Sequence, residues 1–316
     1  MTPRSFMTGD QEKIIQLLLA YRTGGNVMRY PTVWRLQLLL DSRVWDLEQD
    51  IRLWENTENH LMACALLWKR QREGTYYALE RILHPGMLET ELPSVMLDWA
   101  IERTGVESLE KATKLSLSVF PLQRILEHDK GLLEAHGFVR SIAGYNVYMT
   151  MGLDTRPTSI NLPDGFQLLP LTEEDLEAYQ ATYGFTPVTI ERQRVLLHNK
   201  EYQHLIVKAP NGQLAAYLEC SFSRAEWGQN KQRAGWIDYI ETQPSFQHLK
   251  LAQVLMLRAF EHLQAQGANR VMLITRHDNH PAQSLFKKVG MEFDDNEYIY
   301  EKEIDTRSTE VIKKSD

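Results

Sequence analysis

Residues 240–252, IETQPSFQHLKLA, connect an apolar strand-like run to a long apolar run with helical spacing. Pro244 has no backbone N–H and therefore ends the strand. The spacing predicts a helix from Leu249 to Gln266, with Gly267 just past its end. Backbone N–H groups at the start of a helix bind anions, so this turn has the form of a phosphate-binding loop.

Lys250 stands where such a loop would be expected to hold a glycine. A glycine would let the backbone approach a phosphate with no Cβ in the way, whereas lysine adds both bulk and a positive charge. We expect the turn to form in an α-conformation, which needs no glycine. The lysine side chain then either lies in solvent, as on an ordinary core helix, or contacts the phosphate as a point charge.

The rest of the second half predicts alternating strands and helices around this loop. Asn211 and Gly212 form a hairpin turn, and Thr172 to Asp175 have a helix-capping signature. The segment around Trp227, SRAEWGQNKQR, reads as a polar hairpin loop, either a plain connection or a lid over a substrate. Strands are expected at 166–171, from 204, from 213, at 235–242, 270–275 and 298–304, and helices at 189–199, 249–266 and 281–289.

The first half repeats this order. LMACAL from Leu61 resembles LAAYLE from Leu214, and HGF from His136 resembles VGM from Val289, with the same offset of about 150 residues. A tandem duplication is the natural explanation. Helices are expected at 10–21, 91–102 and from 121 to 137, helical spacing runs through 33–54, and strands are expected at 61–68, 74–83, 111–120 and 139–151.

The boundary between the halves is expected in TRPTSINLPDG, residues 155–165, because prolines, glycine and small polar residues are typical of a linker. This predicts a first domain at 1–154 and a second at 166–305. Residues 306–316 are polar and are expected to form a frayed tail.

The loop and a second motif together resemble the GNAT superfamily of N-acetyltransferases. Motif A of that family is a strand, a turn and then Gln/Arg-x-x-Gly-x-Gly/Ala, and its three fixed positions fall on Gln247, Lys250 and Ala252. The resemblance covers about 166–304, and the whole chain resembles a tandem GNAT protein whose first half is a degenerate copy. The family's later Asn, Ala, Leu-Tyr, Gly-Phe signature is matched by Asn279, Ala282, Leu285, Phe286 and Gly290.

The resemblance implies an α/β (α+β) fold of two tandem domains, each with a mixed, mostly antiparallel sheet flanked by helices. It also implies acetyl-CoA as co-substrate, with the pyrophosphate on the loop and the pantetheine arm along a strand that splays from its neighbour. The implied cofactor-binding residues are Ile240, Thr242, Gln247, His248, Leu249, Lys250, Leu251, Ala252, Asn279 and Phe286.

Acyl transfer to an amine needs a base, and two acids occur in the otherwise apolar strand before the loop, Asp238 and Glu241. Either carboxylate could be the base or could bind a cationic amine. Alternatively, each could face solvent or pair with an arginine such as Arg233 or Arg276. Strand alternation predicts that Asp238 shares a face with Trp236, Ile240 and Thr242, and Glu241 with Ile237, Tyr239 and Gln243.

The family often uses a tyrosine as the acid that protonates the leaving thiolate, but Phe286 occupies that position here. Tyr298 is the expected substitute, with Tyr300 as the other tyrosine of the last strand. A metal site is not expected, because the two histidines of HDNH, 277–280, have no obvious third ligand. In the first half, MLETELPSVM places Glu89 and Glu91 where a phosphate would bind, so that half is expected to be structural.

Composition limits the classes of partner. The net charge of −7 argues against a nucleic-acid binder, and no apolar run is long enough to cross a membrane. Cys64 and Cys220 lie in apolar runs and are expected to be buried thiols, and MTPRSFMTGD lacks the core of a signal peptide, so a cytoplasmic location is expected. The expected partner is a small amine, and a homodimer is compatible with the sequence.

The sequence therefore predicts an acetyl-CoA-dependent N-acetyltransferase that moves the acetyl group to a primary amine by direct attack, with a strand carboxylate as base. The alternative is a GNAT-like protein that binds an acyl-CoA without turnover or serves as a structural element, because Lys250 and Phe286 depart from the family pattern.

Overall fold

The computed structural model of the protein describes residues 1–305 except 26–30, 41–45, 71–75, 155–159, 184–186 and 230–231. The chain divides into two compact units: Met1–Asn146 with Asp295–Asp316 (unit 1), and Val147–Asp294 (unit 2). The division falls at Asn146 and Asp294 rather than within 155–165, because the end of the chain returns to unit 1. The predicted roles of the two domains remain predictions.

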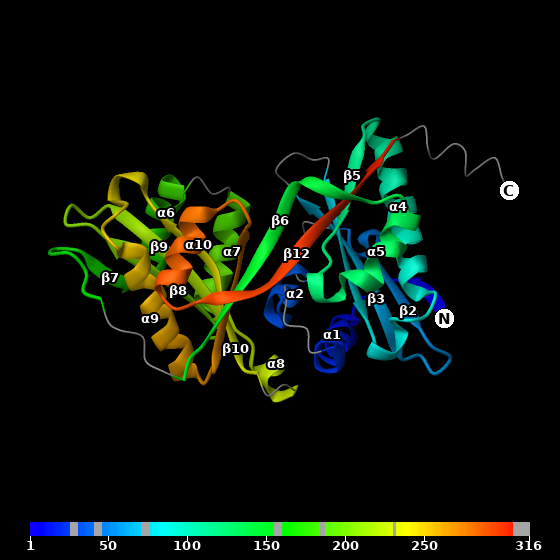
Figure 1. Ribbon diagram of the computed structural model, residues 1–316, viewed down its shortest axis with the longest axis horizontal. Coiled ribbons are helices and arrows are strands. Elements are labelled where there is room, and N and C mark those ends of the chain that lie inside the picture. Colours follow the sequence, from blue (N-terminus) through cyan, green and yellow to red (C-terminus); the bar gives the residue numbers. More distant parts are fainter. Residues whose placement is uncertain are drawn as a thin grey trace. The chain divides into compact units, whose positions relative to one another are not determined.

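Unit 1 contains a sheet in the order β1-β2-β3-β4-β5-β12 (Figure 1). All neighbours are antiparallel except β4 and β5, which are parallel. The last strand pairs with β5 from Tyr300 opposite Val119 to Ile304 opposite Leu115. The strands are β1 (Thr2–Ser5), β2 (Ile51–Glu55), β3 (Leu61–Arg70), β4 (Tyr76–Leu83), β5 (Leu115–Val119) and β12 (Glu292–Ile304), of which β12 begins in unit 2.

Alternate residues of the unit 1 strands enter two different cores, so the sheet is covered on both faces. Cys64 and Leu66 pack with residues of α1 and α2, whereas Ala63, Ala65 and Leu67 pack with residues of α4 and α5. The helices are α1 (Gln11–Gly25), α2 (Val33–Leu40), α3 (Leu47–Asp50), α4 (Leu92–Lys111) and α5 (Leu126–Ala135), with the short 3₁₀ turns η1 (Pro85–Met87) and η2 (Gln123–Ile125).

One expectation for this unit was wrong: the helical spacing through 33–54 ends in strand β2. Leu53 lies in the core under α1, and Trp54 lies in the core under α4. A strand buried on both faces has continuous apolar residues, which single-sequence spacing does not separate from a helix.

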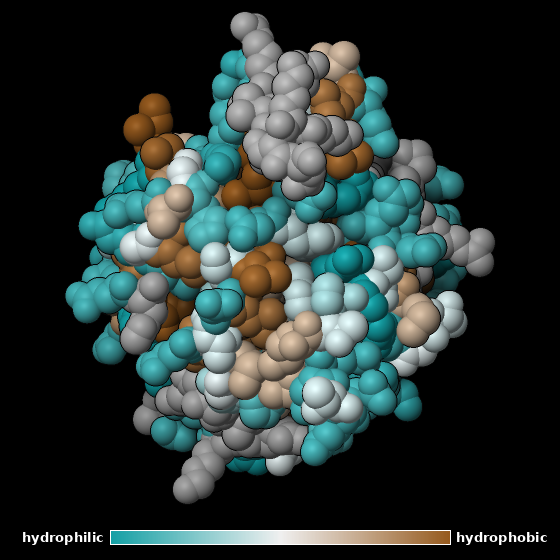
Figure 2. All heavy atoms as spheres, turned by 90° about the vertical axis from the view of Figure 1, so that its right-hand side faces the viewer, coloured by the Kyte–Doolittle hydropathy of each residue, from teal (hydrophilic) through white to brown (hydrophobic). Residues whose placement is uncertain are grey.

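The surface of the face shown in Figure 2 is mixed, with apolar side chains in separate groups among hydrophilic ones.

Unit 2 contains a sheet in the order β6-β11-β10-β9-β8-β7. The pairs β7–β8, β8–β9 and β9–β10 are antiparallel, whereas the pair β10–β11 is parallel. The bounds are β6 (Val139–Gly152), β7 (Gln167–Pro170), β8 (Tyr202–Lys208), β9 (Leu214–Phe222), β10 (Ala234–Thr242) and β11 (Arg270–Arg276), of which β6 begins in unit 1.

Helix α9 packs closely on one face of this sheet. A Cβ added at Gly235 would lie 2.7 Å from a methyl group of Leu263, so only glycine allows this approach. The opposite face holds α6, whose Tyr179 packs against Tyr217 of β9. The helices are α6 (Leu176–Tyr183), α7 (Pro187–Leu197), α8 (Arg224–Gln229), α9 (Leu251–Gln266) and α10 (His280–Lys288), with the 3₁₀ turns η3 (Glu173–Asp175) and η4 (Pro244–Phe246).

Local signals in unit 2 gave mixed results. The capping box of Thr172 and Asp175 is present, and Gly267 caps α9 in the left-handed conformation, as predicted. The segment around Trp227 is not a plain loop but includes α8, because the indole stacks on Phe222 and donates to the Ala234 carbonyl at 2.9 Å. In the described part of the chain, no helix combines the length and the apolar character that a membrane crossing requires.

Candidate active site

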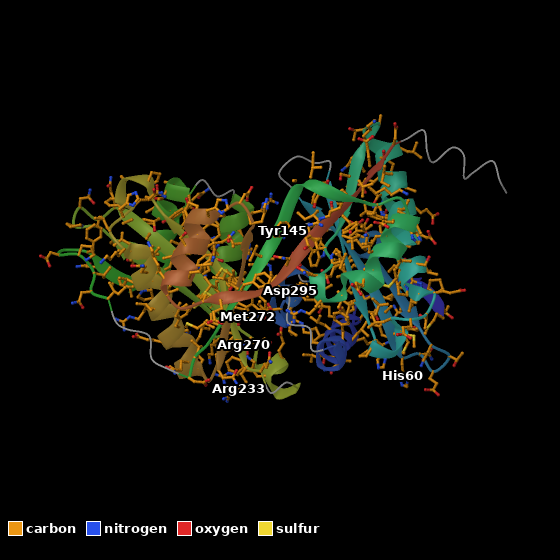
Figure 3. The ribbon with its side chains drawn as sticks, in the orientation of Figure 1. His60, Tyr145, Arg233, Arg270, Met272 and Asp295 are labelled. Carbon is orange, nitrogen blue, oxygen red and sulfur yellow. The ribbon has the colours of Figure 1, made fainter. Side chains whose placement is uncertain are left out.

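The strands β10 and β11 separate after a short parallel pairing. They pair from Ala234 opposite Arg270 to Ile237 opposite Leu273, and then β10 continues to Thr242 without pairing to β11. Over the same residues β10 stays paired with β9. One edge of the β10 backbone is therefore unused by the sheet, beside the predicted contacts Ile240 and Thr242. Figure 3 labels Arg233 and Arg270 at the opposite, paired end of these strands.

A β-bulge lies at the point where the strands separate. The β10–β9 register shifts between Ile237, which pairs with Cys220, and Tyr239, which pairs with Glu219. The extra residue reverses the alternation of side chains. The predicted grouping of faces was therefore wrong: Trp236, opposite Ser221, shares its face with Tyr239, opposite Glu219, and not with Ile240.

The loop after β10 keeps a glycine-like backbone without a glycine. Lys250 has φ 62° and ψ 14°, and His248 has φ 66°, so both lie in the left-handed region. The expected α-conformation of Lys250 was therefore wrong. Each such residue costs roughly 1–2 kcal/mol when it carries a Cβ. Turns that contain left-handed residues direct successive N–H groups into a concavity that binds anions.

The N–H groups at the start of α9 have no side-chain cap. Lys250 is the N-cap residue and offers no side-chain acceptor to the first turn, and the first helical bond runs from Val254 N to Lys250 O at 3.1 Å. The side chains of residues 247–250 are exposed, so the lysine lies in solvent at the loop. The segment from Leu249 to Ala252 therefore combines uncapped N–H donors with one exposed lysine.

The remaining predicted cofactor residues lie on α10. Asn279 is the N-cap of this helix, and its Oδ1 accepts a hydrogen bond from Ala282 N at 3.3 Å. Phe286 is buried and cannot donate a proton. Within the described ranges, no group of three or more His, Cys, Asp and Glu side chains could hold a metal ion.

The predicted catalytic residues are divided between the units. Asp238 and Glu241 belong to unit 2, whereas Tyr298 belongs to unit 1. There its hydroxyl contacts Gln123 Oε1 at 3.3 Å, and its ring lies 3.9 Å from the guanidinium of Arg140. Tyr145, labelled in Figure 3, lies against the same ring. The described contacts of the Tyr298 side chain are thus with side chains of its own unit.

Sequence reasoning missed the polar residues around Glu241. Tyr239 donates a hydrogen bond to Glu241 Oε2. The pKa of Tyr239 is raised, mainly by burial and to a smaller extent by this hydrogen bond. The neighbouring strand carries Glu219, which is buried and accepts hydrogen bonds from Tyr202 and Tyr217. The available signal was an acid within LAAYLECSF, a run too apolar for a solvent-facing strand.

Unit 1 has the strand arrangement but not the loop. Strands β4 and β5 pair in parallel only from Tyr76 to Leu79, and beyond that point Arg81 forms an ion pair of 2.7 Å with Asp129 of α5. Both side chains are largely buried. None of residues 84–92, all of them described, has a positive φ.

Comparison with known proteins agrees with this geometry. Residues 168–291 match the family model described as Acetyltransferase (GNAT) family. A GCN5-related N-acetyltransferase from Sphaerobacter thermophilus has a similar structure, with a TM-score of 0.69, 17% identity and coverage of 96% of each chain. No curated protein sequence matches the chain.

Two further similar structures contain tandem or acyl-CoA-bound folds. One is a tandem GNAT protein from the clavulanic acid biosynthesis pathway, with a TM-score of 0.73, 14% identity and coverage of 96% of this chain and 98% of that one. The other is Saccharomyces cerevisiae N-myristoyltransferase with bound myristoyl-CoA. Its TM-score is 0.62 at 12% sequence identity, and the match covers 95% of this chain and 78% of that one.

Residues 168–291 thus match the GNAT acetyltransferase family, and the fold of the whole chain is similar to that of a tandem GNAT protein. The predicted fold class, two domains with mixed, mostly antiparallel sheets flanked by helices, is confirmed. The GNAT match lies entirely within the segment that forms unit 2.

Proposed function

We propose that unit 2 is an acetyl-CoA-dependent N-acetyltransferase that acts on a primary amine by direct attack. The observation that carries the proposal is the left-handed pair His248 and Lys250 directly after the free edge of β10. A non-glycine residue is held in this costly conformation only where the surrounding structure requires it, and such residues cluster at ligand sites.

The chain offers suitable contacts to each part of an acyl-CoA. The free edge of β10 at Ile240 and Thr242 suits the pantetheine amides, and Thr242 Oγ1 is a buried atom with no hydrogen-bond partner in the described structure. The N–H groups of 249–252 and the Lys250 ammonium suit the pyrophosphate. When bound, acyl-CoA supplies an acyl thioester, whose C–S bond breaks as the C–N bond forms.

We assign Glu241 as the base that takes the proton from the attacking amine. It is partly exposed, next to the free edge of β10, and the Tyr239 hydroxyl holds its orientation. Asp238, at the bulge, is the other candidate. Because the side chain of Phe286 has no acidic proton to donate, the thiolate leaves without a dedicated acid, which slows the reaction but does not prevent it.

The substitution of Phe286 also favours a second candidate function, an acyl-CoA-binding protein without turnover. Thiol release from acetyl-CoA in the presence of a panel of primary amines tests the two. We expect amine-dependent release that Glu241→Gln lowers by about 100-fold, as for loss of a general base, with acetyl-CoA affinity unchanged. Glu261→Gln on α9 is the matched control. Acetyl-CoA binding without release for any amine would support the binding protein instead.

A further inference from the structure

Two carboxylates lie close together on the face of the unit 2 sheet opposite α9. Glu219 pairs across the strands with Tyr239, and Glu241 pairs with Tyr217. Glu219 and Glu241 are therefore diagonal neighbours, with Cα atoms roughly 7–8 Å apart. Two negative charges at this spacing repel each other unless a cation lies near them.

Glu219 keeps its charge in the core with neutral donors only. Tyr202 and Tyr217 donate to it through their hydroxyls, and Gln193 Nε2 donates at 2.8 Å. Burial alone would raise the pKa of Glu219, but the charge of Arg192 and the hydrogen bonds from the two tyrosines hold it below its ordinary value. Among the described residues no basic side chain forms an ion pair with Glu219 or Glu241. A buried anion without a paired cation is costly.

Two buried acceptors beside Glu219 have no donor. The Tyr217 proton is given to Glu219, so His204 Nδ1, 3.1 Å from that hydroxyl, must carry its own hydrogen. His204 is neutral, because burial lowers its pKa to about 4. Its Nε2 is therefore a free acceptor, and Gln193 Oε1 is another. These side chains are 2% and 1% exposed.

Tyrosine rings connect this buried region to the surface. Tyr217 lies 4.6 Å from Tyr179, 5.6 Å from Tyr183 and 5.9 Å from Tyr239, measured between ring centroids. Tyr217 is buried, whereas Tyr239 is 40% exposed. Aromatic faces attract cations, and together with unpaired acceptors and carboxylates they suit a group with several N–H donors and a positive charge.

We propose that the acceptor is an amine with a second ammonium group, which binds at the Glu219 end of this face while Glu241 takes the proton from the reacting amine. This inference rests on the proposed function. The reacting amine must be uncharged when it attacks, so a monoamine leaves Glu219 without a cation during transfer. A diamine keeps one positive charge beside Glu219 throughout. Glu219 is then a residue that determines specificity.

Calorimetric titration with two probes tests this inference. The probes are 1,4-diaminobutane and butylamine, which differ in the second ammonium group, titrated with and without coenzyme A. We expect the diamine to bind the wild-type protein at least about ten-fold more tightly than butylamine. Glu219→Gln should remove this preference and leave the affinity for butylamine within about two-fold. Glu261→Gln should preserve the preference.

Two outcomes overturn the inference: equal affinities of the wild type for both amines, or an equal loss of both in Glu219→Gln. Because Glu219→Gln could disturb folding, Gln193→Met provides a second test: at similar volume it removes the free acceptor Oε1 together with the Nε2 donor to Glu219, and it should weaken only the diamine. A separate titration with coenzyme A alone tests the proposed function. Coenzyme A binding without diamine preference would leave that function standing and refute this inference.

Discussion

At the scale of single residues, the loop at Lys250 shows what the sequence could and could not predict. The position of the loop follows from spacing and residue type, and so does the start of α9, which was predicted at Leu249 and lies at Leu251. The left-handed conformation of Lys250 does not, because lysine disfavours it and only the surrounding fold imposes it. Glu219 was missed because two of its hydrogen-bond donors, Tyr202 of β8 and Gln193 of α7, lie 17 and 26 residues away in the sequence.

The conformation of Lys250 predicts that Lys250→Gly stabilises the protein. Glycine has no Cβ to clash at φ 62°, so we expect the free energy of unfolding to rise by about 1 kcal/mol. Urea denaturation followed by circular dichroism measures this change. The control is Lys287→Gly, an exposed helical position in α10, where glycine should cost about 1 kcal/mol. A loss of stability in Lys250→Gly would mean that the lysine side chain itself stabilises the loop.

At the scale of elements, long periodic segments were predictable and irregular ones were not. The strands β3 and β9 and the helix α9 were located from apolar runs and caps. The short α8 was missed because its order comes from Trp227 packing on Phe222. The bulge in β10 was missed because the sequence does not show which residue is left out of the ladder.

The contact between α9 and β10 gives a second prediction. Gly235→Ala would place a Cβ 2.7 Å from Leu263, and we expect a loss of about 1–3 kcal/mol in the free energy of unfolding, as for overpacking in a core. Gly228→Ala in α8, where a Cβ meets nothing within 4 Å, should be neutral or slightly stabilising. Equal effects of the two substitutions in thermal denaturation would show that α9 does not lie this close to the sheet.

At the scale of the whole molecule, the last strand is the least predictable feature. The sequence placed β12 with the second half, yet it pairs with β5 of unit 1 over five register positions. Such a pairing joins residues about 180 positions apart, which local patterns cannot encode. The tandem arrangement itself was predictable, because the two halves repeat the same order of strands and helices.

The pairing of β12 predicts an unequal effect of two truncations. A chain that ends at Asp294 lacks the strand that covers β5, so we expect unit 1 to unfold and the protein to aggregate through the exposed edge. A chain that ends at Asp305 keeps the strand and should retain its thermal midpoint. Gel filtration and thermal denaturation distinguish these chains, and a folded monomer that ends at Asp294 would contradict this pairing.

We propose that unit 2 alone holds the acyl-CoA site, at the loop of His248 and Lys250. The most direct test is calorimetric titration of the full chain with acetyl-CoA, repeated on Lys250→Glu and, as a control in unit 1, on Glu89→Gln. We expect one site per chain, with binding about ten-fold or more weaker in Lys250→Glu and unchanged in Glu89→Gln, because the charge reversal repels the pyrophosphate. Absence of binding, two sites per chain, or equal affinity of Lys250→Glu and wild type would contradict it.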